Sequence, residues 1–255
     1  MNVSIIGCGN IGKELARFIE SDEHFDLVGL VDIEVRAIRD TQMMLKKKVP
    51  QLTIKEAVDA ADLVIESADK SIVKDIVALC AEKGKKVLVL SVGGLIANPE
   101  LLGKCSIYLP SGAIAGLDAI TAVREKIEKL TLTTTKPLRA LRGAPYLTEK
   151  NINVEKIKEK TVLFSGPFKE AINGFPQNIN VAASLYLASR FENLQVAIIA
   201  DPDATLNTHE IICRGEFGTI TIKTENKPSK NPKTSYLAVL SAISVLKKIN
   251  ESCTF

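Results

Sequence analysis

The feature that most constrains the fold is a glycine-rich turn placed between an apolar run and an amphipathic stretch near the start of the chain. Residues 3–6 are aliphatic except for Ser4, residues 7–12 read Gly-Cys-Gly-Asn-Ile-Gly, and residues 11–20 carry apolar side chains at helical spacing. In such a strand-turn-helix unit, Gly7 permits the tight turn, Gly9 lets a pyrophosphate approach the backbone, and Gly12 allows the helix to pack closely on the strand. The phosphates would then lie at the positive end of the helix.

An acidic residue completes this pattern. Asp32 ends the second apolar run, where it would accept hydrogen bonds from an adenosine ribose and repel a 2′-phosphate. This arrangement favours NAD over NADP, although Arg36 partly offsets the repulsion. The sequence therefore predicts that NAD or NADP binds at Gly7, Gly9, Asn10, Ile11, Gly12 and Asp32.

The first hundred residues alternate apolar runs with amphipathic stretches, which is typical of a parallel sheet with crossover helices. We expect strands at residues 3–6, 27–31, 63–65 and 87–90, and helices at residues 11–20, 34–45 and 71–83, the last ending at Gly84. This half is predicted to be a Rossmann-type doubly wound α/β domain.

The pattern changes after about residue 110. Alternating polar and apolar residues predict strands with one solvated face at residues 129–135, 195–200, 208–213 and 219–224, and Gly215 and Gly218 suggest a hairpin between the last two. A final helix is expected at residues 234–249, and it can rejoin the first domain. We therefore predict a dinucleotide-binding domain of residues 1–110 plus 231–255, and an α+β substrate and dimerisation domain of residues 111–230.

Composition limits the classes of partner. The chain has 46% hydrophobic and 25% charged residues and a net charge of +3, with no basic block and no apolar run of membrane-spanning length, so we expect neither nucleic acid nor membrane as a partner. Its five cysteines are scattered without metal-ligand spacing, which favours reduced thiols, a cytoplasmic location and no bound metal.

The candidates for acid-base chemistry are few, because the chain has only two histidines. His24 lies in a polar connection and is expected at the surface, whereas His209 begins a strand and is either a catalytic residue or a half-exposed strand position. Asn178 and Asn180 precede a helix of small residues, where amides either cap the helix or orient a carboxylate. Lys233 precedes the final helix and is either part of an anion site or a solvated side chain.

Taken together, these segments resemble the L-aspartate dehydrogenase family over nearly the whole chain. The resemblance rests on the glycine turn and on residues 91–94, 110–114, 134–137, 175–183, 200–202, 207–211, 225–226 and 231–235. It implies oxidation of L-aspartate to iminosuccinate, then oxaloacetate and ammonia, with NAD or NADP as hydride acceptor, in a step that feeds NAD biosynthesis.

The resemblance also assigns roles to individual residues. It implies that His209 is catalytic, that Ala113 and Asn180 contact the cofactor, and that the enzyme is a homodimer. The two carboxylates of aspartate need cations or amides, and charge placement suggests Lys233, Lys136 and the Asn178–Asn180 region as their partners.

Two alternatives use the same nucleotide domain. One is another two-domain enzyme, such as a cyclic imine reductase or a homoserine-type dehydrogenase, which would not need the segment 207–211. The other is a non-catalytic dinucleotide sensor, in which cofactor binding without turnover would drive a partner interaction.

Overall fold

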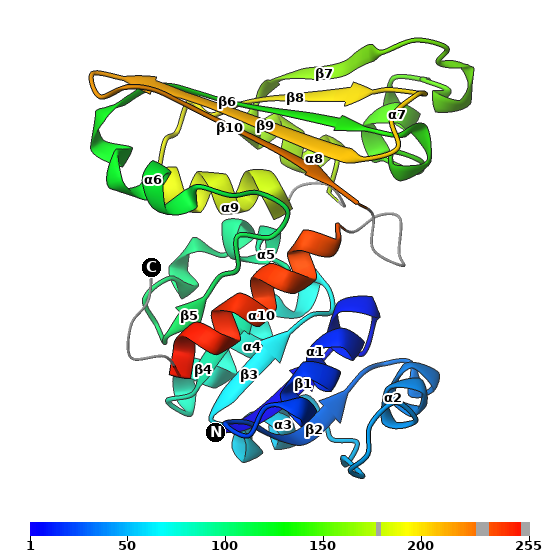
Figure 1. Ribbon diagram of the computed structural model, residues 1–255, viewed down its shortest axis with the longest axis vertical. Helices are drawn as coiled ribbons and strands as arrows, with labels where there is room; N and C mark the ends of the chain where they lie inside the picture. Colours follow the sequence, from blue (N-terminus) through cyan, green and yellow to red (C-terminus); the bar gives the residue numbers. More distant parts are fainter. Residues whose placement is uncertain (177–179, 228–234, 251–255) are drawn as a thin grey trace. The chain divides into compact units, whose positions relative to one another are not determined.

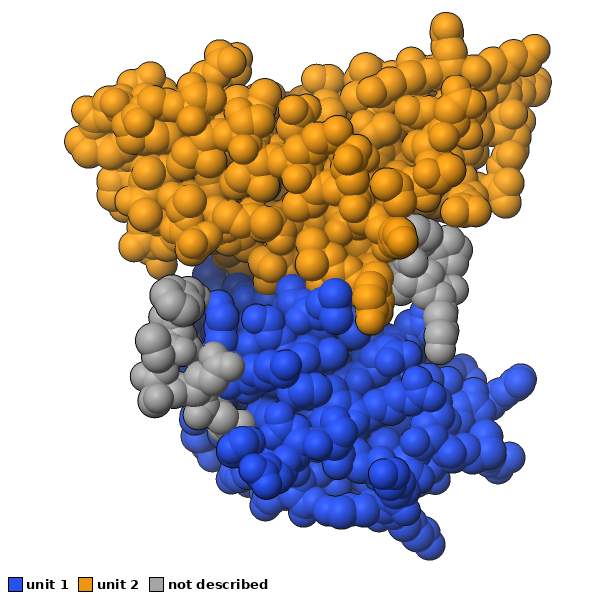
Figure 2. Space-filling model, in the orientation of Figure 1, with its two compact units in different colours: residues 1–110, 239–255 blue, residues 111–238 orange. Residues whose placement is uncertain are grey.

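The computed structural model describes residues 1–176, 180–227 and 235–250. Its contacts divide the chain into two compact units, which Figure 2 colours separately. Unit 1 comprises residues 1–110 and 239–255, and unit 2 comprises residues 111–238. The domain boundary that we placed between residues 230 and 231 lies outside the described residues.

Unit 1 is built on a parallel sheet of five strands in the order β2-β1-β3-β4-β5. The strands are β1 (Asn2–Ile6), β2 (Asp26–Val31), β3 (Leu63–Glu66), β4 (Lys86–Val89) and β5 (Ile107–Tyr108). All of β3 and most of β1 are buried, as their aliphatic sequences predict for strands covered on both faces. The predicted doubly wound α/β architecture is thereby confirmed.

The crossover segments of unit 1 contain α1 (Asn10–Ser21), α2 (Val35–Gln42), α3 (Ile54–Ala60), α4 (Val73–Glu82) and α5 (Gly93–Ala97). Helix α2 is shorter than the predicted residues 34–45, and a side chain from α1 explains why. The Glu20 carboxylate accepts hydrogen bonds from the backbone N–H groups of Lys46 (2.6 Å) and Lys47 (2.8 Å), so the chain after Gln42 follows this carboxylate instead of continuing the helix. Gly84 ends α4 in a left-handed conformation, as predicted.

The final helix, α10 (Tyr236–Asn250), returns to unit 1 as the sequence suggested. Ala242 and Leu246 are fully buried in the same cluster as Leu15 and Ile19 of α1, and Figure 1 shows α10 alongside α1. No helix in the described part of the chain is long and apolar enough to cross a membrane.

Unit 2 contains a mixed sheet in the order β10-β9-β6-β8-β7. Its strands are β6 (Ile127–Lys136), β7 (Thr161–Pro167), β8 (Gln195–Ala200), β9 (Asn207–Gly215) and β10 (Gly218–Asn226). Strands β6 and β8 pair in parallel, and the other neighbouring strands of this sheet pair antiparallel. Figure 1 shows α6 (Leu117–Ala122), α8 (Phe168–Gly174) and α9 (Asn180–Ser189) on one face of this sheet. The buried positions of β6 and β9 alternate with more exposed ones, which confirms the predicted one-sided strands.

The predicted hairpin is present, since β9 and β10 pair from Gly215 opposite Gly218 to Asn207 opposite Asn226. Gly218 has a φ of 108°, a conformation that favours glycine. The sequence did not predict β7, the edge strand, nor the short α7 (Pro145–Glu149).

Candidate active site

The glycine turn in unit 1 leaves bare backbone at the start of α1. Gly7 has a φ of 104°, and a Cβ there would lie 2.5 Å from the backbone carbon of Ser67. A Cβ on Gly12 would lie 1.9 Å from the carbonyl oxygen of Gly7, so the helix cannot pack here with any larger residue. At Gly9 a Cβ would meet no atom within 4 Å, which leaves open space above the backbone.

This turn fits the pyrophosphate of a dinucleotide. Helix α1 has no side-chain cap and no acidic residue in its first turn, so its backbone N–H groups, beginning at Asn10 and Ile11, are available to an anion. The open space at Gly9 adjoins these groups. NAD or NADP can therefore be held through its phosphates by the chain's own backbone.

Asp32 is placed at the end of β2, next to the glycine turn. Its Oδ2 accepts a hydrogen bond from the Cys8 N–H (2.7 Å), and its Oδ1 accepts one from the Glu34 N–H (2.8 Å). The carboxylate therefore fixes the turn to β2, a role that the sequence did not indicate, and its remaining lone pairs can still accept from a ribose. Burial, with the charge of Asp32 as a second cause, raises the pKa of the Cys8 thiol to about 11, so Cys8 is an uncharged packing residue.

A second carboxylate, which unlike Asp32 is fully buried, organises the loops that follow β3 and β4. Glu66 is fully buried, and it accepts hydrogen bonds from the Ala68 N–H (2.9 Å), the Ser91 N–H (2.9 Å) and the Ser91 hydroxyl (2.8 Å). Burial raises the pKa of Glu66, while these donors oppose that shift. Glu66 was not predicted as a site residue, although its position as an acidic residue directly after the aliphatic run 63–65 was an available signal.

In unit 2, the buried face of the sheet changes from apolar to polar along the strands. The side-chain rows across β6, β9 and β10 are, in order, Leu130, Cys213 and Ile220; Leu132, Ile211 and Ile222; Thr134, His209 and Thr224; and finally Asn207 beside Asn226. Lys136 follows Thr135, which pairs with Thr208, so continuing this antiparallel register by one residue places Lys136 opposite Asn207 in this last row. We call Thr134, Lys136, Asn207, His209, Thr224 and Asn226 the polar cluster.

His209 lies at the centre of the polar cluster and is only 2% exposed. Its Nδ1 is 3.0 Å from the Thr134 hydroxyl, so this hydrogen bond orients the ring and leaves Nε2 for a ligand. Burial lowers the pKa of His209 to about 3, with the charge of Lys136 as a second cause. The ring is therefore neutral near neutral pH, which a proton acceptor requires.

Lys136 is 5% exposed, and burial lowers its pKa to about 8. Its charge adds to burial in lowering the pKa of His209, so the two side chains are close enough to interact and place a cation near a neutral base.

The segment that contains Ala113 is tied to the same end of the sheet. The carbonyl oxygen of Ala113 accepts hydrogen bonds from the Thr224 hydroxyl and the Asn226 side-chain amide, both at 2.9 Å. Asn180 is the exposed first residue of α9 and is not in the polar cluster. Asn178 and Lys233, the other candidates for carboxylate binding, lie outside the described residues.

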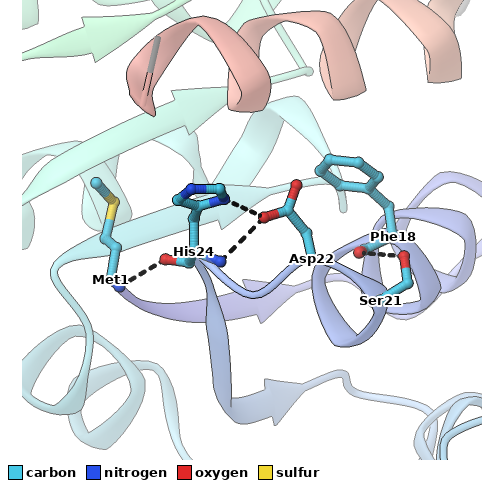
Figure 3. Close-up of polar contacts among 5 residues, drawn as sticks. All are labelled: Met1, Phe18, Ser21, Asp22 and His24. Atoms are coloured by element: carbon cyan, nitrogen blue, oxygen red, sulfur yellow. Dashed lines mark hydrogen bonds and ion pairs between the residues drawn. The ribbon is translucent and has the colours of Figure 1, made fainter.

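His24 belongs to neither the glycine turn nor the polar cluster. It lies in the connection between α1 and β2, where its Nδ1 is 2.9 Å from Asp22 Oδ1 and its side chain is 60% exposed (Figure 3). Its carbonyl oxygen accepts a hydrogen bond from the N-terminal amine of Met1 (2.7 Å). The expectation of a surface histidine is confirmed. Within the described residues, no group of three or more His, Cys, Asp or Glu side chains is arranged to hold a metal ion.

Comparison with known proteins assigns both parts of the chain to dehydrogenase families. Residues 7–106 match the family model described as homoserine dehydrogenase, NAD binding domain, and residues 118–249 match aspartate dehydrogenase, C-terminal. The L-aspartate dehydrogenases of Methanosarcina acetivorans and Methanosarcina mazei are 44% and 45% identical, each match covering 98% of this chain and 97% of the relative. The crystal structure of aspartate dehydrogenase from Thermotoga maritima has a TM-score of 0.76 at 25% identity, over 100% of this chain and 99% of that one.

Proposed function

The chain belongs to the aspartate dehydrogenase family and is an NAD(P)-dependent oxidoreductase, and we propose that it converts L-aspartate to iminosuccinate with His209 as the proton acceptor. Water then converts the imine to oxaloacetate and ammonia. The observation that carries this proposal is the neutral, buried imidazole of His209 beside a buried lysine. NAD or NADP, when bound, supplies the hydride acceptor.

His209 has the protonation state that the first step needs. The substrate nitrogen must lose its extra proton before its lone pair can form a double bond to carbon. When Nδ1–H donates to the Thr134 hydroxyl, Nε2 carries the lone pair that accepts this proton. After this proton has passed to solvent, the same nitrogen can take a proton from the water that adds to the imine.

Lys136 is the described candidate for binding a substrate carboxylate, and Lys233 and Asn178 stay as further proposals. Burial is the main cause of the low pKa of His209, and a carboxylate beside Lys136 would offset the second cause, the Lys136 charge. Substrate binding would then make His209 a stronger base at the moment when it is needed. This coupling supports a carboxylate-bearing amine as the substrate.

For the cofactor, we propose that Gly7, Gly9, Asn10, Ile11 and Gly12 hold the pyrophosphate and that Asp32 binds the adenosine ribose. The uncapped start of α1 and the open space at Gly9 support this assignment. Ala113 and Asn180 are proposed as further cofactor contacts. We also propose a cytoplasmic homodimer that supplies iminosuccinate to NAD biosynthesis.

The test is a substrate panel with the purified chain and either NAD or NADP, followed by the absorbance of the reduced nicotinamide. We expect reduction with L-aspartate, with release of an equimolar amount of ammonia, and little with L-glutamate, L-malate or L-homoserine. Reduction with malate or homoserine but not with aspartate would overturn the proposal.

A further inference from the structure

One atom of the polar cluster has no hydrogen-bond partner. Asn207 is 2% exposed, and its side-chain oxygen Oδ1 is buried without a donor among the residues that the structure describes. Buried polar atoms are hydrogen-bonded in the great majority of cases, and leaving one unbonded costs about 1–3 kcal/mol. An acceptor left open at this place therefore points to a ligand that brings a donor.

The neighbouring donors that the structure resolves point elsewhere. The side-chain amide of Asn226, which pairs with Asn207 across β10, donates to the carbonyl oxygen of Ala113 at 2.9 Å. The Thr134 hydroxyl is engaged with His209 Nδ1, and the Thr224 hydroxyl donates to Ala113. The two hydroxyls and the amide are thus committed to holding the site together.

Asn207 lies on the same strand as His209, the proposed base, and close to it. Asn207 and His209 are two residues apart on β9 and both face the buried side, so their Cα atoms are about 6.6 Å apart along the strand. An atom between the two side chains can approach both of them. The ligand group that fits between these two side chains gives one proton to the His209 base and donates a second hydrogen to Asn207 Oδ1.

We propose that Asn207 Oδ1 accepts a hydrogen bond from the amino group of the substrate and thereby selects an amine over an alcohol at the reacting carbon. This inference rests on the proposed function. It assigns to Asn207 a specificity role in addition to the proton transfer assigned to His209.

The chemistry of the two substrate classes differs in the number of hydrogens. An ammonium group that gives one proton to His209 keeps two N–H groups, so one remains for Asn207. An alcohol that gives its only O–H proton to His209 has none left, and its oxygen would face Asn207 Oδ1 with lone pairs on both sides. Positive charge also develops on nitrogen as the C=N bond forms, and the amide oxygen stabilises that charge.

Strand β6, next to β9, contributes a side chain that can bind the carboxylate of an α-amino acid. Lys136 lies next to Asn207 in the same row, and adjacent strands are about 4.8 Å apart. An α-amino acid carries its amine and its carboxylate on the same carbon. Its amine can therefore face Asn207 while its carboxylate faces Lys136. A simple amine without the carboxylate would use only half of this arrangement.

The experiment compares the wild-type chain with the Asn207→Leu and Asn207→Asp variants, using L-aspartate as substrate and succinate as a competitive inhibitor. Succinate has both carboxylates and no amine, so it reports on the carboxylate site alone. In Asn207→Leu we expect kcat/KM for L-aspartate to fall by about 10- to 100-fold, because an acceptor bond is lost, while the inhibition constant of succinate changes less than about 2-fold. Asn207→Asp keeps an acceptor oxygen and should retain more activity than Asn207→Leu.

Other outcomes would overturn the assignment. Equal losses for aspartate and succinate would make Asn207 a purely structural residue, and no loss for either would remove it from the site. If Asn207→Leu does not fold, Asn207→Ala removes the side-chain acceptor without adding bulk and gives the same comparison. A wild-type chain that is inactive with L-aspartate would refute the proposed function, whereas an active wild type with unchanged Asn207 variants refutes this inference alone.

Discussion

The buried imidazole of His209 predicts a specific loss of stability in acid. In the unfolded chain its pKa returns to the ordinary value of 6.5, whereas in the folded chain burial holds it at about 3. The unfolded state therefore binds a proton first, so the stability is fully present above pH 6.5 and falls as the pH drops from 6.5 toward 3. The slope is about 1.36 kcal/mol per pH unit.

This slope gives a number that can be measured. Between about pH 7.5 and about pH 5, His209 alone removes about 2 kcal/mol from the free energy of unfolding. Chemical unfolding followed by far-ultraviolet circular dichroism at both pH values gives this loss for the wild type. In His209→Gln the loss should be smaller by about 2 kcal/mol, because glutamine does not titrate.

The other histidine provides the control. His24 has a side chain that is 60% exposed, and His24→Gln keeps His209, so this variant should still show the loss of about 2 kcal/mol that His209 causes. If His209→Gln and the wild type lost the same free energy over this pH range, the reasoning about His209 would be refuted.

Three further predictions concern other parts of the site. Gly12→Ala should lower both the melting temperature and the affinity for NAD, because its Cβ would lie 1.9 Å from the Gly7 carbonyl oxygen. Gly9→Ala should lower only the affinity, because its Cβ meets no atom within 4 Å. Calorimetry measures both quantities, and equal melting temperatures for the two variants would contradict the packing argument. Glu66→Leu should destabilise the fold by about 1–3 kcal/mol in urea unfolding, since it leaves the backbone N–H groups of Ala68 and Ser91 without their acceptor, and a neutral effect would be inconsistent with that role. Lys136→Met should move the acidic limb of the kcat/KM profile for L-aspartate to higher pH, because the Lys136 charge lowers the pKa of His209; an unchanged limb would exclude that coupling.

Features with a local cause were predictable from the sequence. The glycine turn, the aliphatic strands of unit 1 and the alternation in β6 and β9 depend on neighbouring residues, and the structure contains each of them. Strand β7 was missed because its sequence ends in Gly166 and Pro167, which normally interrupt strands, and it becomes a strand by pairing with β8 at the sheet edge.

Features set by distant partners were not predictable. The end of α2 depends on Glu20, which lies more than twenty residues before the amides that it accepts from. The place of Lys136 beside Asn207 depends on the register of β6 and β9, which are far apart in the sequence. The sequence therefore indicated His209 and Lys136 as candidates, but only the register brings them together with Asn207.

The central claim is tested most directly by comparing the wild-type chain with His209→Ala for reduction of NAD or NADP by L-aspartate, with cofactor binding measured on the same samples. We predict that the wild type reduces the cofactor and that kcat in the variant falls by about 100-fold or more while cofactor affinity is retained, because a positioned base contributes about 10²- to 10⁴-fold. A variant as active as the wild type would contradict the assignment of His209, and a wild type that binds NAD without oxidising L-aspartate would contradict the account as a whole.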